Sequence, residues 1–270
     1  MNRIETQFQL LQSRGEKALV GFLSAGDPSI FRSLEIIRAM CDAGLDVLEL
    51  GVPFSDPTAD GPVIQRSSAR ALAGGVSLRT VLDMIAALRK AIEIPIIVFT
   101  YYNPVFVYGT RRFYEDAVRA GADGVLVVDL SPEESDEMIG QWPGNALCLI
   151  RLIAPTTPED RIRQVAGSAS GFIYMVSKTG VTGSSGLDAG MVAERVNRVR
   201  SATNLPLCVG FGVSTPEDVA AIASVADGVV VGSAFERIIE ENIENRDLAK
   251  LMGETVRSLK AQTRTTQPTH

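Results

Sequence analysis

The feature that most constrains the fold of this chain is the regular alternation of strand-like and helix-like segments along its 270 residues. Eight short apolar segments have the length and composition of buried strands, and helical patterns lie between them. The expected strands cover residues 17–25, 45–50, 94–101, 123–128, 146–153, 171–176, 207–210 and 228–231. Repeated strand–helix units predict a parallel sheet, either closed as a barrel or open and doubly wound.

No obvious linker interrupts the eight units, so we predict one α/β domain over residues 1–270, a single (β/α)8 TIM barrel. An open doubly wound sheet is the alternative. The apolar spacing within residues 1–14 predicts an N-terminal helix, and another helix is expected directly after Gly61. Both helices are additional to a minimal barrel. The polar tail at residues 263–270 is expected to be disordered.

Charge and hydropathy exclude several classes of protein. The formal net charge is −6, the isoelectric point is about 5.0, and no cluster of Lys and Arg suggests a nucleic-acid partner. No apolar run approaches the length of a membrane span, and the first residues lack the apolar core of a signal peptide. We therefore expect a cytoplasmic protein that binds neither nucleic acid nor membrane.

The distribution of Cys and His argues against a metal site. Cys41, Cys148 and Cys208 are far apart in the sequence, and the only histidine is His270. Zinc sites and Cys–His or Ser–His–Asp mechanisms need more of these residues, at closer spacing. Acid–base chemistry in this chain would then depend on carboxylates, Tyr or Lys.

The segment LELGVPFSDPTADGPVIQ, residues 48–65, holds two informative carboxylates. Glu49 lies near the end of an expected strand, and Asp60 lies just before an expected helix. Both faces of a parallel α/β sheet are buried, so Glu49 points into an interior, where an unpaired carboxylate is costly. One interpretation is a core Glu paired with Lys or Arg, with Asp60 as a cap residue. The other is a catalytic pair at the strand ends, where barrel active sites lie.

Glycine-rich turns and aromatic residues also gather at the expected strand ends. Gly210-Phe-Gly follows the seventh strand and Gly232-Ser follows the eighth. Barrels often bind phosphate there through backbone N–H groups, although such glycines can also serve only as tight turns. Large apolar side chains near several strand ends could wall a pocket for an aromatic ring, or pack as ordinary core. They are Phe22, Phe99, Tyr101, Leu126, Tyr174 and Phe211.

Segments along nearly the whole chain resemble those of the tryptophan synthase alpha subunit family. They are the 48–65 segment, Ala25-Gly-Asp-Pro, Tyr102-Asn-Pro, SKTGVTG, GFGVSTPED and VVVGSA. The resemblance implies a TIM barrel with added helices and a lyase of tryptophan biosynthesis, which cleaves indole-3-glycerol phosphate to indole and glyceraldehyde 3-phosphate. It implies no cofactor or metal in this chain. The expected partner is a pyridoxal-phosphate beta subunit, which receives the indole in an alpha2beta2 complex.

The resemblance also implies roles for single residues. Glu49 matches the proton-transferring Glu of the family, and Asp60 matches the Asp that hydrogen-bonds the indole nitrogen. The matches to phosphate-binding positions are Gly183, Gly212, Gly232 and Ser233. The matches to other positions around the substrate are Phe22, Tyr101, Tyr174, Thr182 and Phe211. Lys178 departs from the Arg of some members, and Lys cannot reproduce the bidentate geometry of Arg.

Three other functions stay open at this point. A stand-alone indole-3-glycerol phosphate lyase would carry the same motifs as an alpha subunit that works in a complex. A non-catalytic regulatory subunit would not need both Glu49 and Asp60, and the sequence retains both. A different phosphate-binding barrel would share the glycine-rich turns but not the 48–65 segment.

Overall fold

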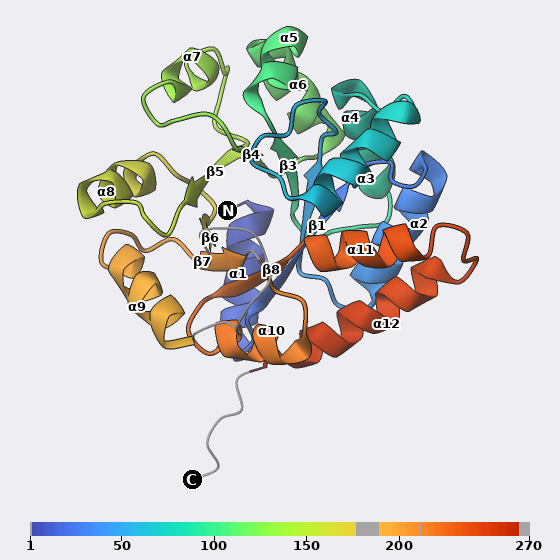
Figure 1. Ribbon diagram of the computed structural model, residues 1–270. Coiled ribbons are helices and arrows are strands. Elements are labelled where there is room, and N and C mark those ends of the chain that lie inside the picture. Colours follow the sequence, from blue (N-terminus) through green and yellow to red (C-terminus); the bar gives the residue numbers. More distant parts are fainter. Residues whose placement is uncertain (1, 177–188, 211, 265–270) are drawn as a thin grey trace.

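Eight parallel strands form a closed barrel in the computed structural model, which describes residues 2–176, 189–210 and 212–264 (Figure 1). Each strand pairs with the next in sequence, and the last pairs with the first. The strands are β1 (Ala18–Ser24), β2 (Val47–Gly51), β3 (Ile96–Thr100), β4 (Gly124–Val127), β5 (Cys148–Ile153), β6 (Ile173–Val176), β7 (Leu207–Gly210) and β8 (Gly228–Val231). The predicted (β/α)8 barrel is confirmed, and an open doubly wound sheet is excluded.

Helices surround the barrel and cover one of its ends (Figure 1). In the described residues they are α1 (Arg3–Ser13), α2 (Ile30–Asp42), α3 (Pro62–Ala73), α4 (Leu78–Leu88), α5 (Tyr102–Tyr108), α6 (Thr110–Ala120), α7 (Ser135–Ile139), α8 (Glu159–Gly167), α9 (Ala189–Arg200), α10 (Pro216–Ala223), α11 (Ser233–Glu241) and α12 (Leu248–Ala261). Several begin at side-chain caps. Ser29 and Thr215 accept hydrogen bonds from backbone N–H groups in the first turns of α2 and α10.

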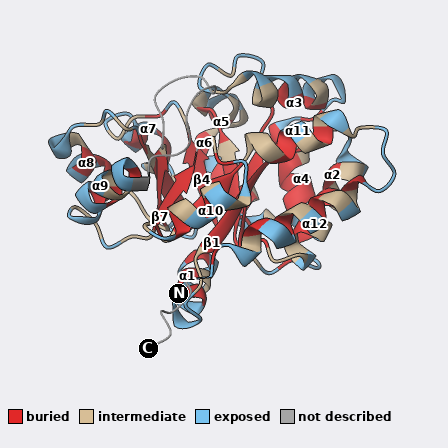
Figure 2. Ribbon diagram, turned by 60° about the horizontal axis from the view of Figure 1, so that its bottom comes forward, coloured by how far each residue is buried: buried red, intermediate tan, exposed pale blue. Residues whose placement is uncertain are grey.

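The strands carry two separate apolar cores because successive side chains point to opposite faces. Leu48 and Leu50 of β2 belong to the larger core between the barrel and its helices, whereas Val47 belongs to the core inside the barrel. Glu49 shares the inward face with Val47. Figure 2 shows the resulting arrangement, with buried strands at the centre and the exposed residues mostly on the outer faces of the helices.

Helix α1 closes the end of the barrel at which the strands begin. Its buried side chains Ile4, Phe8 and Leu11 join the core inside the barrel, and the rings of Phe8 and Phe172 lie 5.9 Å apart. The predicted N-terminal helix therefore closes this end of the barrel. The opposite end, where the strands finish, is free for a site.

Three details refine or correct the sequence prediction. Helix α5 was not expected. Helical sequence was expected from residue 232 to about 260, and it forms two helices, α11 and α12, separated by residues 242–247. Disorder from residue 263 was wrong for Thr263, because this residue is buried and its carbonyl accepts a 2.8 Å hydrogen bond from the N–H of Lys17. Residues 265–270 lie outside the described residues.

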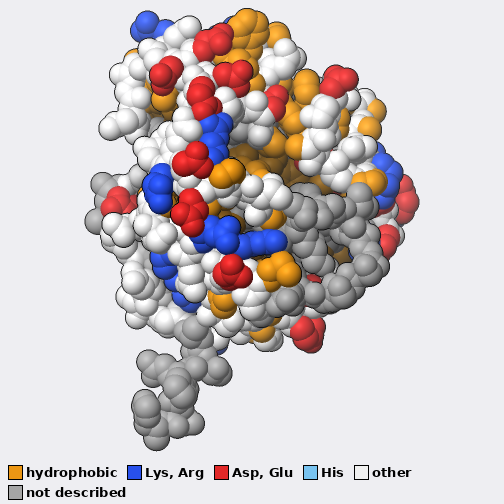
Figure 3. Space-filling view, turned by 60° about the vertical axis from the view of Figure 1, so that its left-hand side comes forward, with side chains coloured by type: hydrophobic (Ala, Val, Ile, Leu, Met, Phe, Trp, Pro, Cys, Tyr) orange, Lys and Arg blue, Asp and Glu red, His pale blue; other side chains and the backbone are white. Residues whose placement is uncertain are grey.

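Two features of the described structure concern membrane and nucleic-acid binding. No single described helix is long and apolar enough to cross a membrane, and only the bent pair α3–α4, at 93°, passes a test of length and composition. Ala71 of α3 and the buried side chains of α4 belong to the larger core. On the face shown in Figure 3, Lys and Arg side chains lie interspersed with Asp and Glu side chains.

Candidate active site

A cavity of about 350 Å³ opens at the end of the barrel where the strands finish. Most of the predicted site residues that the structure describes line it. They are Phe22, Glu49, Asp60, Tyr174, Gly212, Gly232 and Ser233. These residues come from β1, β2, β6 and the loops after β2, β7 and β8, so the closed barrel brings together segments that are far apart in the sequence.

Glu49 is the most unusual side chain in the cavity. It is 0% exposed, and neither carboxylate oxygen has a hydrogen-bond partner among the described residues. Burial alone raises the pKa of Glu49 to about 8. No described Lys or Arg pairs with Glu49, so the described residues do not support its interpretation as a paired core residue. An unpaired, proton-bearing acid that faces a cavity is instead placed to exchange a proton with a ligand.

Asp60 lies just before the start of helix α3, and Tyr101 holds it at the cavity. The Tyr101 hydroxyl donates to Asp60 Oδ2 at 3.0 Å and accepts from the Ala59 N–H at 3.0 Å. Burial raises the pKa of Asp60 to about 6, and the hydrogen bond from Tyr101 opposes that rise. Asp60 is thus mostly ionised near neutral pH, whereas Glu49 is mostly protonated. The two acids offer a proton and a negative charge in the same cavity.

Aromatic rings wall the cavity, and glycines on neighbouring strands make room for them. The rings of Phe22 and Phe99 meet edge to face at 5.0 Å. A Cβ atom on Gly51 would lie 2.7 Å from the Phe22 ring, and one on Gly210 would lie 2.5 Å from the Tyr174 hydroxyl. These spacings are too short for a side chain, so both strands need glycine there. The resulting walls suit a flat aromatic ligand.

The cavity wall also includes the start of helix α11. Gly232 and Ser233 lie at this helix N-terminus, where backbone N–H groups and the helix dipole favour an anion. Gly212, with a φ of +80°, has open space where a side chain would be. Arg237, one turn into α11, also lines the cavity. A phosphate group would find N–H donors and a cation at this wall.

Some predicted residues lie elsewhere. Thr182, Gly183 and Phe211, together with Lys178, are outside the described residues. Tyr101 acts on Asp60, and Leu126 is part of the core inside the barrel. Arg237 was missed, although it follows Ser233 by four residues, the spacing that puts two helical side chains on one face.

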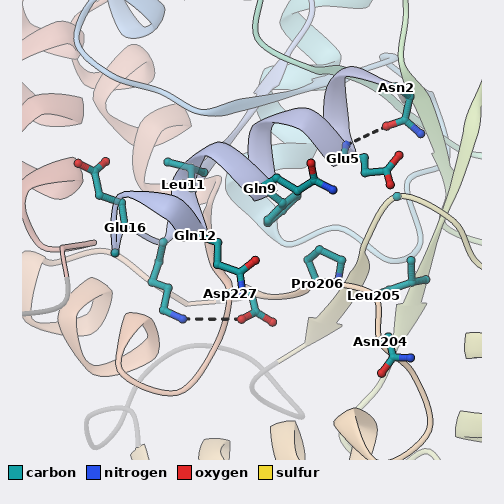
Figure 4. Close-up of a pocket in the computed structure, with 14 residues that line it drawn as sticks. Asn2, Glu5, Gln9, Leu11, Gln12, Glu16, Asn204, Leu205, Pro206 and Asp227 are labelled. Atoms are coloured by element: carbon teal, nitrogen blue, oxygen red, sulfur yellow. Dashed lines mark hydrogen bonds and ion pairs between the residues drawn. The ribbon is translucent and has the colours of Figure 1, made fainter.

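Another cavity, of about 650 Å³, lies at the opposite end of the barrel (Figure 4). Helix α1 and the segments that precede the strands line it, and Lys17 pairs with Asp227 at 3.7 Å. Figure 4 shows mostly polar side chains along α1, and no described residue of the predicted site lies there. Over the described ranges, no group of three or more His, Cys, Asp or Glu side chains could hold a metal ion.

Known proteins resemble this chain over nearly its full length. The family profile described as "Tryptophan synthase alpha chain" matches residues 8–264. Proteins of that name from Desulfatibacillum aliphaticivorans and Desulfosudis oleivorans are 61% and 63% identical over 264 residues, which cover 98% of this chain and 100% of each relative. The crystal structure of tryptophan synthase subunit alpha from Legionella pneumophila str. Paris superposes with a TM-score of 0.91 at 38% identity, and covers 98% of this chain and 100% of that one.

Proposed function

Because this chain belongs to the tryptophan synthase alpha chain family, we propose that Glu49 and Asp60 cleave indole-3-glycerol phosphate in the 350 Å³ cavity. The chain is a carbon–carbon lyase of tryptophan biosynthesis, and the products are indole and glyceraldehyde 3-phosphate. The observation that carries the residue assignment is the buried carboxyl of Glu49, which has no partner in the described residues. The aromatic walls would hold the indole ring.

The two acids can take complementary parts in the cleavage. Breaking the bond between indole carbon 3 and the glycerol chain requires a proton on carbon 3, and this puts positive charge on the ring nitrogen. Glu49, protonated near neutral pH, would deliver that proton. The ionised carboxylate of Asp60 would stabilise the charge on nitrogen. Glu49 would then collect the proton that leaves the side-chain hydroxyl as the aldehyde forms.

The phosphate of the substrate would bind at the start of α11. Gly232 and Ser233 offer backbone N–H groups there, and Gly212 lets the opposing loop approach without a side chain. By their match to the family, Gly183 belongs to this phosphate site and Thr182 to the surroundings of the substrate; both are outside the described residues. The phosphate would thereby orient the glycerol chain toward Glu49.

The proposed partner is a tryptophan synthase beta subunit, in an alpha2beta2 complex in the cytoplasm. Phe106 and Val107 on α5 are 58% and 77% exposed, and α5 begins where β3 ends, at the same end of the barrel as the cavity. Exposed apolar side chains beside a product exit suit a subunit that receives indole. Pyridoxal phosphate would belong to that partner, since the cleavage itself needs only proton transfer and charge stabilisation.

An indole-release assay on the purified chain, with and without a beta subunit, tests this proposal. Indole release from indole-3-glycerol phosphate by the chain alone would support catalysis here and exclude a purely regulatory subunit. Co-purification with a beta subunit would support the complex, whereas activity that a beta subunit neither binds nor alters would indicate a stand-alone lyase.

The pH dependence of kcat/KM is expected to be bell-shaped, with limbs near the pKa values of about 6 for Asp60 and about 8 for Glu49. Below the acid limb, Asp60 gains a proton and loses the charge that stabilises the ring nitrogen. Above the alkaline limb, Glu49 loses the proton that it must donate. Steady-state rates of indole release across this range provide the measurement.

The phosphate of the substrate also titrates near pH ~6. Both ionisations contribute to the acid limb of the profile. The contribution of Asp60 is the part that is absent from the profile of the Asp60→Asn variant. A profile without an alkaline limb would contradict the role of Glu49 as a proton donor.

The Gly212→Val variant is expected to weaken binding of glycerol 3-phosphate by about tenfold or more, because the valine side chain would occupy the anion end of the cavity. Gly75→Val is a matched control. Gly75 has a φ of +78° and Gly212 one of +80°, and both have open space at Cβ, so the backbone strain is the same. Isothermal titration calorimetry measures both affinities. An equal loss in the two variants would point to strain and away from a phosphate site.

A further inference from the structure

Glu236 is a buried acid that the proposed reaction does not use. It lies in the first turn of α11 and is 0% exposed. Its Oε1 accepts a 2.5 Å hydrogen bond from the N–H of Ser24, at the end of β1. Its Oε2 is also buried, and no donor among the described residues bonds to it. An ionised carboxylate here would leave one oxygen without a donor, which is costly.

The neighbour of Glu236 is another acid, Asp27, in the loop after β1. The two carboxyl groups are within hydrogen-bonding contact of each other. Both oxygens of Asp27 also accept from the Arg70 guanidinium, at 2.8 and 2.7 Å. Two carboxylates in contact repel each other strongly when both are ionised. A proton on Oε2 of Glu236 removes that repulsion, and the resulting O–H group donates a hydrogen bond to Asp27.

The same proton balances the charge of the whole cluster. Arg70 also donates to Glu240 at 2.9 Å, and Arg66 donates to Glu240 at 2.6 and 2.7 Å. With Glu236 neutral, the two arginines balance the two anions, Asp27 and Glu240. Burial is the largest cause that raises the pKa of Glu236 to about 8, and the charge of Asp27 is the next.

The cluster joins three segments that meet around the cavity. Asp27 is in the loop after β1, Arg66 and Arg70 are on α3, and Glu236 and Glu240 are on α11. Helix α3 begins just after Asp60, and α11 begins at the proposed phosphate site. Helix α12 also packs against α11, and none of its charged side chains is among the groups that shift the pKa of Glu236. The cluster therefore links α11 to α3 and to the loop after β1.

We propose that Glu236 is a proton-bearing positioning residue, which ties the first turn of α11 to the loop after β1, and that loss of its proton weakens phosphate binding at the start of α11. The proposal rests on the phosphate site proposed above. Ionised Glu236 would place a negative charge less than one helical turn from Ser233. That charge would repel a phosphate dianion and offset the favourable dipole of the helix.

Infrared spectroscopy of the purified chain tests the proton directly. We expect a carboxylic-acid C=O band near neutral pH that the Glu236→Gln variant lacks. Glutamine keeps the shape and can accept from Ser24 and donate to Asp27, so this variant is expected to fold. The Asp27→Asn variant is a second test. An amide donor next to Glu236 favours its ionised form, so the carboxylic-acid band should disappear at a lower pH than in the parent chain. Absence of a band that depends on Glu236 would overturn the proposal.

Phosphate affinity tests the coupling. Two variants are compared, one with Glu49→Gln alone and one with Glu49→Gln and Glu236→Gln, so that Glu49 titrates in neither. Calorimetry gives the Kd of glycerol 3-phosphate at about pH 7 and about pH 9, where the phosphate charge is constant. The chain with Glu236 is expected to lose affinity about threefold or more between these conditions, and the chain with Glu236→Gln is expected to lose less. The same loss in both chains would overturn the role of Glu236. Failure of both chains to bind at about pH 7 would instead overturn the proposed phosphate site, and the coupling with it.

Discussion

Replacement of Glu49 with Gln is expected to lower the rate of indole release by about 10²- to 10⁴-fold, the range for a general acid–base group. Glutamine has the shape of the neutral acid but cannot give up a proton. The structure leaves both Glu49 oxygens without a protein partner among the described residues, so no hydrogen bond would be lost in the exchange. Single-turnover rates of indole formation measure the effect.

Two measurements separate chemistry from folding in the Glu49→Gln variant. Thermal unfolding should show no loss of stability, since a buried titratable acid is replaced by a neutral amide of the same size. The affinity for glycerol 3-phosphate should be close to that of the parent chain, because the phosphate end of the cavity is unchanged. Turnover near the parent rate, with the substitution confirmed by mass, would rule out proton transfer by Glu49.

Replacement of Asp60 with Asn is expected to lower kcat by about 10²- to 10³-fold, the usual loss when one stabilising group for a developing charge is removed. Asparagine can still accept from Tyr101, so the loop should keep its position. It lacks the negative charge that would stabilise the protonated indole ring. The measurement is kcat and KM for indole release at a pH between the two limbs of the profile.

Asp56 offers a matched control in the same loop. It is exposed, its carboxylate accepts a 2.5 Å hydrogen bond from the hydroxyl of the adjacent Ser55, and it does not line the cavity. Asp56→Asn therefore removes an equal charge without touching the site, and the isolated chain should keep its kcat. A similar fall in both variants would mean that the loop, and not the Asp60 charge, was disturbed.

The strands were predictable because their patterns are local. Strands β7 and β8 have the predicted bounds, since short runs of Val, Leu and Cys are bounded by residues that end strands. Helix α5 was not predictable in the same way, because Tyr102-Asn-Pro reads as a turn. Proline is nevertheless accepted in a first helical turn, where no N–H bond is needed, and Asp129 accepts a 2.7 Å hydrogen bond from the N–H of Tyr102.

The two acids of the proposed mechanism could be singled out from the sequence, but their environment could not be predicted. A sequence motif identified Glu49 and Asp60. The missing partner of Glu49 follows from the packing of several strands, and the bond from Tyr101 to Asp60 joins residues 41 apart. Glu236 had no sequence signal, because a Glu in a charged helical stretch is ordinarily solvated. Its burial depends on contacts with β1 and α3, more than 150 residues earlier in the chain.

The close approach of Gly51 to Phe22, and of Gly210 to Tyr174, constrains how such a site can evolve. At Gly51 a larger residue fits only after the Phe22 ring has become smaller, because a Cβ would lie 2.7 Å from that ring. At Gly210 a Cβ would lie 2.5 Å from the Tyr174 hydroxyl and 2.8 Å from Val230 Cβ, so both neighbours would have to change. A single change at either place is harmful, by collision or by loss of the wall, while matched changes can be tolerated together. The order of substitutions is therefore restricted, and altered walls are more readily reached from libraries that randomise the contacting positions at once.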